Sequence, residues 1–529
     1  MSYDVRYLIN KGYSGDFGIE RSFNITAVEL VKRKIIAIDS ERVSLVQGPP
    51  GTGKTTVFQQ VINECLDETD ENEVFLYVAP TNKLVADMLA RVASIYRNQE
   101  KTLEDLKKEV RVYGSRFRYG GEFEHLRKPI DDDVKIVLST EYQRIYESEA
   151  ARRYHLLIDE ASKSPIHRPF ITISDRLLEL IQQSEKEGIL ESLNVIGDPK
   201  QAIALGDEYR GREDLLLLTN LIRGLLSEKL KMEVDRGEID ITEAAFQELR
   251  GTFYEFLEVT RRLPHPSETP ISVGFYGGNL RAYKKADEIL KEVANQWDTN
   301  EARELSNLND DYFKTVDILN SAITTGVPII YVHVRGDYLR DYLFNERRAK
   351  VGLLFSCAIK KILKENVTIV APYVDQQLQM KLRMHHLYGD VLGEDIKAIN
   401  FTTIHRMLGA EDSHIIAILG KERTGRLYHE RTIYFMEPEV FNVQLSRHKK
   451  LLVIVGDLFK LRREAKKMYE YLSGEEPRSF QESSLKLKVK QLEMTTEQIL
   501  ELANISSYNT LRRVPSVSSG DGCLFFRWE

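Results

Sequence analysis

The feature that most constrains the fold of this chain is a glycine-rich loop between an apolar run and a helical pattern. The apolar run covers Val43 to Gln47, the loop reads Gly-Pro-Pro-Gly-Thr-Gly-Lys-Thr over residues 48–55, and the helical pattern begins at Thr56. Glycines in such a loop allow successive backbone N–H groups to turn inward around a phosphate, and the following helix points its positive end at the same place. The segment therefore predicts a strand, a phosphate-binding loop and a helix.

The loop also assigns roles to individual side chains. Lys54 is expected to reach the β- and γ-phosphates of ATP, and Thr55 to supply a hydroxyl to Mg²⁺, which is otherwise held mainly by water and phosphate oxygens. An ordinary glycine turn is the alternative, but the strand and helix patterns on either side favour phosphate binding. The predicted nucleotide-binding residues of the loop are Gly48, Pro49, Pro50, Gly51, Thr52, Gly53, Lys54, Thr55 and Thr56.

Length, charge and cysteine content exclude several classes of protein. A chain of 529 residues is too long for one ordinary core and suggests about two to four domains. With 74 basic and 81 acidic residues the formal charge is -7, which excludes a generally basic nucleic-acid coat, so any nucleic-acid site must be a local groove. The three cysteines are far apart and lack C-x-x-C spacing, so neither a disulfide framework nor a zinc site is indicated.

The sequence shows no pattern typical of a signal peptide or a membrane span. The N-terminus lacks a basic segment followed by an apolar one, and no apolar run approaches the ~18 residues needed to cross a bilayer. We therefore expect a soluble intracellular protein, cytoplasmic or nuclear, without membrane contact. We also expect a monomer.

Short apolar runs alternate with helical patterns along most of the chain, which predicts an α/β fold with parallel sheets covered by helices. We expect a first lobe over residues 1–225, a helical insertion or linker over 226–256, a second lobe over 257–470 with a helical insertion near 281–325, and a C-terminal extension over 471–529. The expected strands are 43–47, 74–79, 134–139, 155–158 and 193–197 in the first lobe, and 329–334, 367–371, 398–402, 414–419, 432–435 and 451–455 in the second.

Polar motifs follow the strands of the first lobe, at the edge where open α/β sheets bind their ligands. The fourth run ends in Asp159 and Glu160. Asp159 is expected to hold Mg²⁺, directly or through water, and Glu160 to orient and deprotonate the attacking water. Gln201 follows the fifth run and is expected to contact the γ-phosphate or that water. The second lobe has no phosphate loop, which suggests that nucleotide lies between two similar lobes.

Two segments leave alternatives open. Residues 111–121 interleave arginines with aromatic rings, a mixture that suits single-stranded nucleic acid. The same mixture equally suits a surface loop with solvated arginines and one or two rings tucked into the domain. The C-terminal extension closes on an apolar segment, 523–529, that either docks back on a lobe or binds a protein partner.

Taken in order, these motifs resemble those of the superfamily-one helicases, in the branch of the nonsense-mediated-decay helicase and its DNA-replication and splicing relatives. Residues 47–56 are similar to the first motif of that branch almost letter for letter. The resemblance covers about residues 20–457, and the further motifs follow in the family order at 79–82, 139–140, 159–162, 197–201, 257–266, 275–280, 371–376, 403–411 and 442–447.

This resemblance implies two RecA-like lobes in tandem that grip single-stranded DNA or RNA and bind ATP with Mg²⁺ in the cleft between them. It places Arg262 and Arg447 at the γ-phosphate, where an arginine finger can contribute ~10³ or more in rate. It places Glu411 near the ribose or the lobe interface. The residues that match or neighbour strand-contacting positions of the family are Pro80, Thr81, Asn82, Thr140, Tyr373 and Thr403.

The chain departs from the family pattern at three places. The family's adenine-reading glutamine is absent from Asn24-Ile-Thr-Ala27, and Arg261 replaces the ring that stacks on the base, although its flat guanidinium group can still stack. The segment His-Arg-Met-Leu-Gly at 405–409 replaces Asp-x-x-Gln-Gly, so a polar coupling between nucleotide and strand is missing or rebuilt. These changes bear on base choice and on unwinding more than on hydrolysis.

The activity that the resemblance implies is that of an ATP-dependent helicase, which moves 5′ to 3′ along a single strand and unwinds duplex. The alternative is a nucleic-acid-stimulated switch or remodelling factor that hydrolyses nucleotide without separating strands. A metabolic kinase with a phosphate loop is a weaker alternative, which the arginines of the second lobe oppose. The sequence does not distinguish a DNA track from an RNA track.

Overall fold

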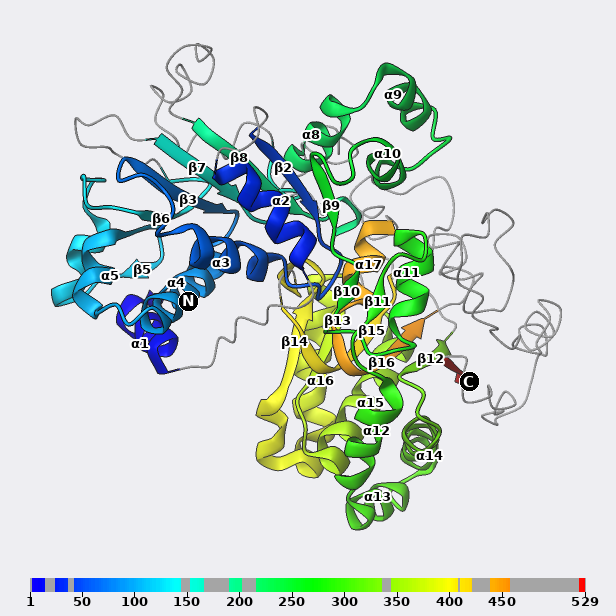
Figure 1. The fold of residues 1–529 in the computed structure, drawn as a ribbon. Helices are drawn as coiled ribbons and strands as arrows, with labels where there is room; N and C mark the ends of the chain where they lie inside the picture. The colour runs from blue at the N-terminus through cyan, green and yellow to red at the C-terminus, as the bar shows by residue number, and fades with distance from the viewer. Residues whose placement is uncertain are drawn as a thin grey trace. The chain divides into compact units, whose positions relative to one another are not determined.

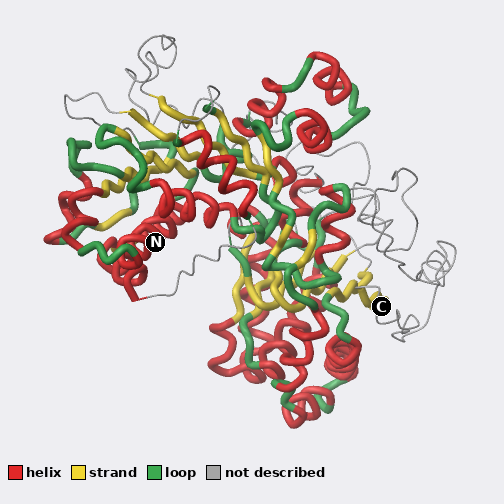
Figure 2. The backbone as a smooth tube through the Cα atoms, in the orientation of Figure 1, coloured by secondary structure: helices red, strands yellow, loops and turns green. Residues whose placement is uncertain are grey.

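The computed structural model describes residues 2–14, 24–36, 42–143, 153–165, 190–201, 216–334, 344–407, 410–420, 438–456 and 523–528. The chain divides into two units, one formed by residues 1–49 and 53–257 and the other by residues 50–52 and 258–529. Figure 1 shows the helices and strands of each unit, and Figure 2 shows that each has its own sheet. The predicted α/β fold of two parallel-sheet lobes in tandem with helical insertions is confirmed.

The first lobe is built on a seven-stranded sheet whose described neighbours all pair in parallel. Five of the strands overlap those expected from sequence, because strands of a parallel sheet are covered on both faces and so read as continuous apolar runs. The other two, β4 and β9, have only four and three residues and show no such run. In spatial order the strands are β4 (Val110–Tyr113), β6 (Ile136–Thr140), β3 (Glu73–Ala79), β7 (Arg153–Ile158), β8 (Leu190–Gly197), β2 (Val43–Gln47) and β9 (Tyr254–Phe256).

Helices α3 and α4 form much of the apolar core of the first lobe with the sheet. Helix α4 starts at a threonine cap, because the Thr81 hydroxyl accepts a hydrogen bond from the backbone N–H of Leu84. The described helices of this lobe are α1 (Val5–Ser14), α2 (Ile25–Ile35), α3 (Lys54–Cys65), α4 (Asn82–Asn98), α5 (Leu103–Glu109), α8 (Leu217–Leu225), α9 (Glu228–Asp235) and α10 (Ile241–Glu248), with a short strand pair β1 (Tyr3–Asp4) and β5 (Phe117–Arg118).

The helical insertion of the first lobe differs from the prediction at both ends. It begins with α8, before the expected start at residue 226, and it ends before β9. Residues 254–256, which the sequence assigned to the insertion, pair in parallel with β2 and extend the first sheet. Three residues are too few to show the periodicity by which a strand is recognised in sequence.

The segment of interleaved arginines and rings at 111–121 packs into the first lobe. Arg111 is buried and donates a hydrogen bond to Asp131 over 2.7 Å. The hydroxyls of Tyr113 and Tyr119 each donate to a backbone carbonyl over 2.5 Å, and the Phe117 ring is buried. These contacts favour the alternative of rings tucked into the domain over a stacking surface for nucleic acid.

The second lobe is built on a six-stranded sheet, again parallel at every described pairing. Five of the expected strands match observed ones to within a few residues, and the expected strand at 432–435 lies outside the described residues. In spatial order the strands are β14 (Ile399–Thr403), β13 (Val367–Ala371), β15 (Asp412–Ile418), β16 (His448–Gly456), β12 (Ile329–Val334) and β17 (Cys523–Trp528).

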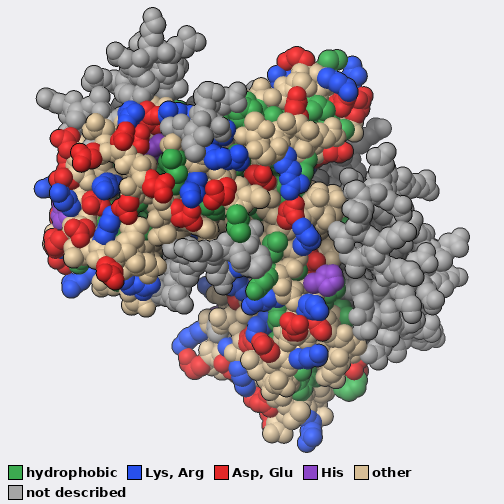
Figure 3. Space-filling view, viewed as in Figure 1, with side chains coloured by type: hydrophobic (Ala, Val, Ile, Leu, Met, Phe, Trp, Pro, Cys, Tyr) green, Lys and Arg blue, Asp and Glu red, His purple; other side chains and the backbone are tan. Residues whose placement is uncertain are grey.

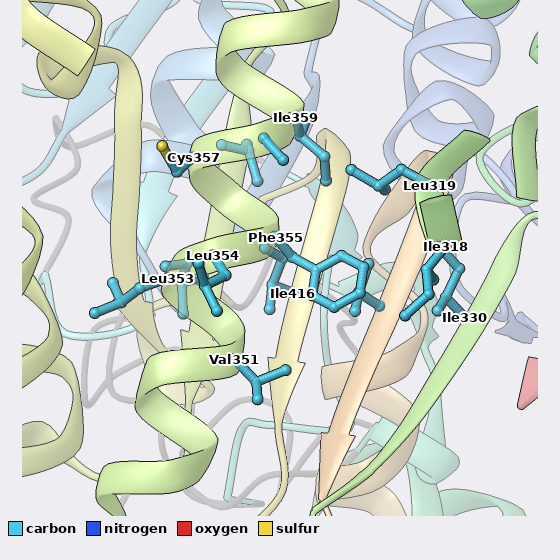
Figure 4. Packing of buried hydrophobic residues seen from close by; sticks show 14 of the residues in the cluster. Ile318, Leu319, Ile330, Val351, Leu353, Leu354, Phe355, Cys357, Ile359 and Ile416 are labelled. Carbon is cyan, nitrogen blue, oxygen red and sulfur yellow. The ribbon is translucent and has the colours of Figure 1, made fainter. Parts of the chain in front are cut away.

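Helix α15 is the central packing element of the second lobe. Figure 4 shows its apolar side chains facing Ile416 of β15 and, across the layer, Ile318 and Leu319 of α14 and Ile330 of β12. The described helices are α11 (Glu268–Tyr276), α12 (Ala286–Asn295), α13 (Thr299–Ser306), α14 (Asp310–Thr325), α15 (Glu346–Leu363), α16 (Val374–Leu392) and α17 (Pro438–Leu445), and a short parallel pair joins β10 (Val259–Thr260) to β11 (Arg281–Ala282). Helices α12 to α14 occupy the insertion expected near 281–325.

The apolar C-terminal segment docks on the second lobe. Strand β17 pairs in parallel with β12 at six consecutive positions, from Ile329 with Cys523 to Val334 with Trp528. Of the two alternatives that the sequence left open, docking on a lobe is therefore the one observed for this segment. Among the described residues, no helix is long and apolar enough to span a membrane.

A charged cluster joins the beginnings of three strands of the second sheet. The Glu365 carboxylate accepts from His414 Nε2 over 3.0 Å and from Lys450 Nζ over 2.5 Å. Burial acts to raise the pKa of Glu365, but the two hydrogen bonds and the neighbouring charges outweigh burial and lower this pKa to about 2.

We predict that this cluster makes the second lobe sensitive to acid. Because the folded-state pKa of Glu365 lies below its ordinary value of 4.5, the carboxylate stabilises the fold above that pH, and this contribution is lost as pH falls from 4.5 toward 2. Urea unfolding at pH 6 and pH 3 should show a smaller loss of stability in Glu365→Gln than in the unmodified chain. Equal losses in both proteins would contradict the assignment.

Candidate nucleotide and nucleic-acid site

The phosphate loop has the backbone conformation that its glycines predict. Gly51 and Gly53 have φ angles of 72° and 83°, in the left-handed region that favours glycine. A Cβ atom on Gly51 would also lie 2.3 Å from Cβ of Arg262, so a side chain at this position would collide. Gly53 is the residue before the first turn of α3, and the N–H of Gly48 donates to the carbonyl of Gly197 at the end of β8. The loop is thus anchored at the carboxyl edge of the first sheet.

The predicted catalytic glutamate lies beside the lysine of the loop. Lys54 Nζ donates to the carbonyl of Gly48 over 2.9 Å and lies 3.6 Å from Glu160 Oε1. Lys163 Nζ donates to Glu160 Oε2 over 2.6 Å. Glu160 is buried and has a positive φ of 53°, which is uncommon for a residue with a side chain. The sequence predicted roles for Lys54 and Glu160 but none for Lys163.

The two predicted metal-binding residues meet in the first lobe. Asp159 Oδ2 accepts hydrogen bonds of 2.8 Å from both Thr55 Oγ1 and the Tyr77 hydroxyl, and Asp159 Oδ1 accepts from the N–H of Glu160. Asp159 is fully buried, and burial, followed by the Glu160 charge, raises its pKa, whereas the hydrogen bonds from Thr55 and Tyr77 act to lower it. A hydroxyl and a carboxylate held together at the phosphate loop are the hard oxygen donors that suit Mg²⁺.

Gln201 is connected to the strand that carries the phosphate loop. Its Nε2 donates to Asp198 Oδ2 over 2.5 Å, and Nε2 of Gln47 donates to Asp198 Oδ1 over 3.3 Å. The side-chain oxygen of Gln47 in turn accepts from the hydroxyls of Thr242 and Tyr254. The helical insertion is therefore linked to Gln201 by buried hydrogen bonds, a connection that nothing in the sequence indicated.

The predicted residues Arg262, Glu411 and Arg447 also lie near one another, in the second lobe. Arg262 Nε donates to Glu411 Oε2 over 2.7 Å, and Arg262 Nη1 donates to the carbonyl of Ser446, the neighbour of Arg447. Burial acts to raise the pKa of Glu411, but the Arg262 charge and hydrogen bonds from Lys449 and Arg262 lower it to about 2. Glu411 is thus held ionised as the carboxylate partner of Arg262. Arg447 is itself buried, with Nε donating to the carbonyl of Val443.

Arg261 lies against an aromatic ring that the sequence analysis missed. Its guanidinium carbon is 5.4 Å from the ring centre of Tyr283, and the Tyr283 side chain is 52% exposed. The N–H of Tyr283 donates to the carbonyl of Thr260, and the N–H of Arg261 donates to the carbonyl of Gly51. This pair of flat side chains is therefore attached through the backbone to the tip of the phosphate loop. The sequence signal that could have identified Tyr283 is a tyrosine that follows the motif in which Arg261 replaces the family's aromatic ring.

The predicted nucleic-acid residues lie at adjoining strand ends within each lobe. In the first lobe Ala79 at the end of β3 is paired with Thr140 at the end of β6, and Pro80, Thr81 and Asn82 lead from β3 into α4. Thr81 is exposed and Asn82 half-buried, whereas Pro80 and Thr140 are buried.

The second lobe repeats this arrangement. Ala371 at the end of β13 is paired with Thr403 at the end of β14, and Tyr373 is the residue before the first turn of α16. Tyr373 and Thr403 are buried. In both lobes a helix of at least 17 residues therefore begins beside these strand ends and directs its N-terminal N–H groups toward them.

The chain matches two family models, one in each lobe. Residues 32–207 match a model described as an AAA domain, and residues 267–458 match a second model with the same description. The putative helicase mov-10-B.2 of Danio rerio is 24% identical over 454 residues, which cover 79% of this chain and 40% of that protein. The replicase polyprotein 1ab of Breda virus 1 is 29% identical over 182 residues, 34% of this chain and 2% of the polyprotein. The chain spans less than half the length of these curated relatives.

Two solved structures with bound nucleic acid align with this chain at low similarity. S. cerevisiae Dbp5 bound to RNA and ADP BeF3 aligns over 87% of this chain and 91% of its own, with a TM-score of 0.37 and 10% identity. The helicase MrfA bound to DNA aligns over 85% of this chain and 50% of its own, with a TM-score of 0.35 and 12% identity.

The fold and the site together define a protein of two parallel-sheet lobes, each matched by an AAA-domain model, with a phosphate loop at the edge of the first sheet and Arg262 and Arg447 in the second lobe. The chain belongs to the superfamily-one helicases, in the branch of the nonsense-mediated-decay helicase and its relatives.

We predict that Glu411 positions Arg262 for nucleotide hydrolysis. Glu411→Gln keeps the size of the side chain but removes the charge that holds Arg262, so kcat for ATP should fall about 10-fold or more while nucleotide binding changes little. Steady-state hydrolysis and titration with a fluorescent ATP analogue measure the two effects. Glu394→Gln, an exposed carboxylate paired with Lys397, is the matched control and should behave like the unmodified chain.

Proposed function

We propose that this protein is an ATP-dependent helicase that translocates 5′ to 3′ on single-stranded nucleic acid and unwinds duplex ahead of it. The observation that carries the proposal is the convergence, at one edge of the first sheet, of the phosphate loop with Asp159 and Glu160. Membership of a helicase family adds support. In the second lobe Arg262 donates to the carbonyl of Ser446, the neighbour of Arg447, so the two predicted arginines lie near each other.

Each predicted residue would have a distinct role in hydrolysis. Glu160 orients the attacking water and accepts its proton, and Lys54 offsets the charge of the phosphates. Thr55 and Asp159 would hold magnesium, which would supply positive charge next to the phosphates. Arg262 and Arg447 supply fixed positive charge to the γ-phosphate, and Gln201 reports its presence. Loss of the γ-phosphate releases these contacts and allows the strand to be moved by one step.

Selection among nucleotides would depend on stacking with the base, because the glutamine that reads adenine in the family is absent from this chain. The half-exposed ring of Tyr283 and the guanidinium group of Arg261 offer two flat surfaces next to the phosphate loop. Stacking is tolerant of base identity because every base has a flat face. We therefore propose that ATP is the main substrate and that other NTPs are also hydrolysed.

The single-stranded nucleic acid would be bound by the ends of β-strands and the N-termini of helices in each lobe. The N-terminus of a helix is a ready site for a phosphate, and α4 and α16 begin beside the predicted contact residues. Over the face shown in Figure 3, Lys and Arg are interleaved with Asp and Glu, as expected for a protein that binds nucleic acid in a local groove. We propose that the protein acts as a monomer, and the chemistry of these contacts suits DNA and RNA alike.

A second candidate function is a nucleic-acid-stimulated switch or remodelling factor that hydrolyses ATP without strand separation. The altered motif after β14 favours it. Residues 405–407 form a single short turn, and the glutamine that the family uses there to couple nucleotide to strand is absent. The remainder of the motif, Leu408 and Gly409, lies outside the described residues.

We predict that Lys54→Ala and Glu160→Gln each abolish ATP hydrolysis stimulated by single strands, the latter while ATP still binds. Lys101→Ala, a lysine of the same lobe paired with Asp67 and Glu109, is the control and should retain full turnover. Measuring hydrolysis beside fluorescent fork unwinding, with matched DNA and RNA, separates the two candidate functions. Stimulated hydrolysis without unwinding would favour the switch, and hydrolysis that no oligonucleotide stimulates would exclude both.

We predict separate effects of a ring and of a charge on strand binding. Tyr142 is 53% exposed just beyond the end of β6, and its replacement by alanine should cost about 1–3 kcal/mol at every salt concentration. Lys83 in the first turn of α4 is exposed. In Lys83→Ala, the slope of log affinity against log salt concentration should become less steep by about the contribution of one phosphate contact. Tyr7→Ala on α1, with 67% of its side chain exposed, is the control for the ring. Affinity that does not depend on salt would contradict a groove along the backbone.

A further inference from the structure

Tyr77 contacts the predicted metal-binding carboxylate from the core of the first lobe. Its hydroxyl donates to Asp159 Oδ2 over 2.8 Å, and the same oxygen accepts from Thr55 Oγ1 over 2.8 Å. Tyr77 and Asp159 are both 0% exposed. None of the sequence motifs that define the family includes this tyrosine.

The position of the Tyr77 hydroxyl is fixed by the sheet and by α3. Tyr77 lies within β3, between β6 and β7, where it pairs with Leu138 on one side and Leu157 on the other. Its ring packs edge-on against Phe58 of α3, with ring centres 6.3 Å apart and planes at 86°. Phe58 belongs to the helix that begins at the phosphate loop, so the ring, the loop and the carboxylate share one rigid support.

We propose that Tyr77 is a positioning residue that holds the Asp159 carboxylate in the orientation needed to bind magnesium with the nucleotide. Groups that hydrogen-bond to a metal ligand orient that ligand, and their removal typically weakens metal binding or activity about 10–100-fold. The donor from Thr55 comes from the phosphate loop itself, where the hydroxyl is also expected to contact the ion. The donor from Tyr77 comes from β3 in the core of the lobe and does not belong to the phosphate loop.

A purely structural role for Tyr77 makes a different prediction. A buried tyrosine hydroxyl needs a hydrogen-bond partner, and its loss would then reduce the stability of the lobe without changing its response to magnesium. The proposal rests on the proposed function, because it assumes that Asp159 serves a magnesium-dependent nucleotide site. The two roles of Tyr77 are therefore separated by the magnesium dependence of nucleotide binding and not by activity alone.

The test is Tyr77→Phe in the full chain, which keeps the ring against Phe58 and removes only the hydroxyl. We expect the magnesium concentration for half-maximal ATP hydrolysis to rise about 10-fold. We also expect the affinity for a fluorescent ATP analogue to fall in magnesium but to stay unchanged in EDTA. Tyr96→Phe is the matched control, since the Tyr96 hydroxyl is equally buried in the same lobe and donates over 2.8 Å to another carboxylate, that of Glu109. It should leave both magnesium titrations unchanged.

Magnesium titrations of Tyr77→Phe that match those of the unmodified chain would overturn the inference. If that variant is less stable than the unmodified chain, the titrations are made at a temperature at which circular dichroism shows both proteins folded, and the same shift in magnesium dependence is expected. In an Asp159→Asn background the loss of the hydroxyl should have no further effect on magnesium-dependent binding, and an undiminished effect there would also overturn the inference. Failure of the proposed function is distinguishable, because the unmodified chain would then show no magnesium-dependent hydrolysis at all.

Discussion

The carboxylate of Asp159 is the group on which the nucleotide site of the first lobe depends. It lies at the end of β7 and receives hydrogen bonds from Thr55 at the start of α3 and from Tyr77 on β3. A fully buried carboxylate is costly unless its oxygens are satisfied, so these bonds hold three elements in one arrangement. Glu160, next in the chain, is thereby brought beside Lys54. One buried charge thus determines the geometry of the phosphate loop and of the residue expected to activate water.

The second lobe depends on an ion pair of a different kind. Glu411 and Arg262 come from segments far apart in the sequence, and the pair is accessible at its carboxylate end. An arginine held by one carboxylate and one backbone carbonyl keeps a defined direction, yet it can exchange a partner for a phosphate. The first lobe therefore has a buried carboxylate bonded to its phosphate loop, and the second has a partly accessible arginine–carboxylate pair.

The sequence predicted the fold well where strands are long and poorly where they are short. Strands such as β2, β12 and β13 match their expected residues because each is a mostly apolar segment of at least five residues. Strand β9 was assigned to a helical insertion because its three residues are too few to show the periodicity of a strand. Strand β17 was one of two alternatives, since an apolar segment does not reveal its partner. The mixture of arginines and rings at 111–121 suggested stacking equally with packing, and its burial depended on neighbours such as Asp131.

The sequence by itself determined which chemical groups this protein can use. The order and spacing of Lys54, Asp159, Gln201, Arg262 and Arg447 indicated a nucleotide-hydrolysing motor, because each motif follows a strand or opens a helix and so must lie at a sheet edge. Only the tertiary structure decided which groups support them. Tyr77, Lys163 and Tyr283 belong to no motif, and Gln47, the first residue of the first motif, is bonded to partners as far as 207 positions away. Such contacts arise from packing in three dimensions, and no pattern along the chain encodes them.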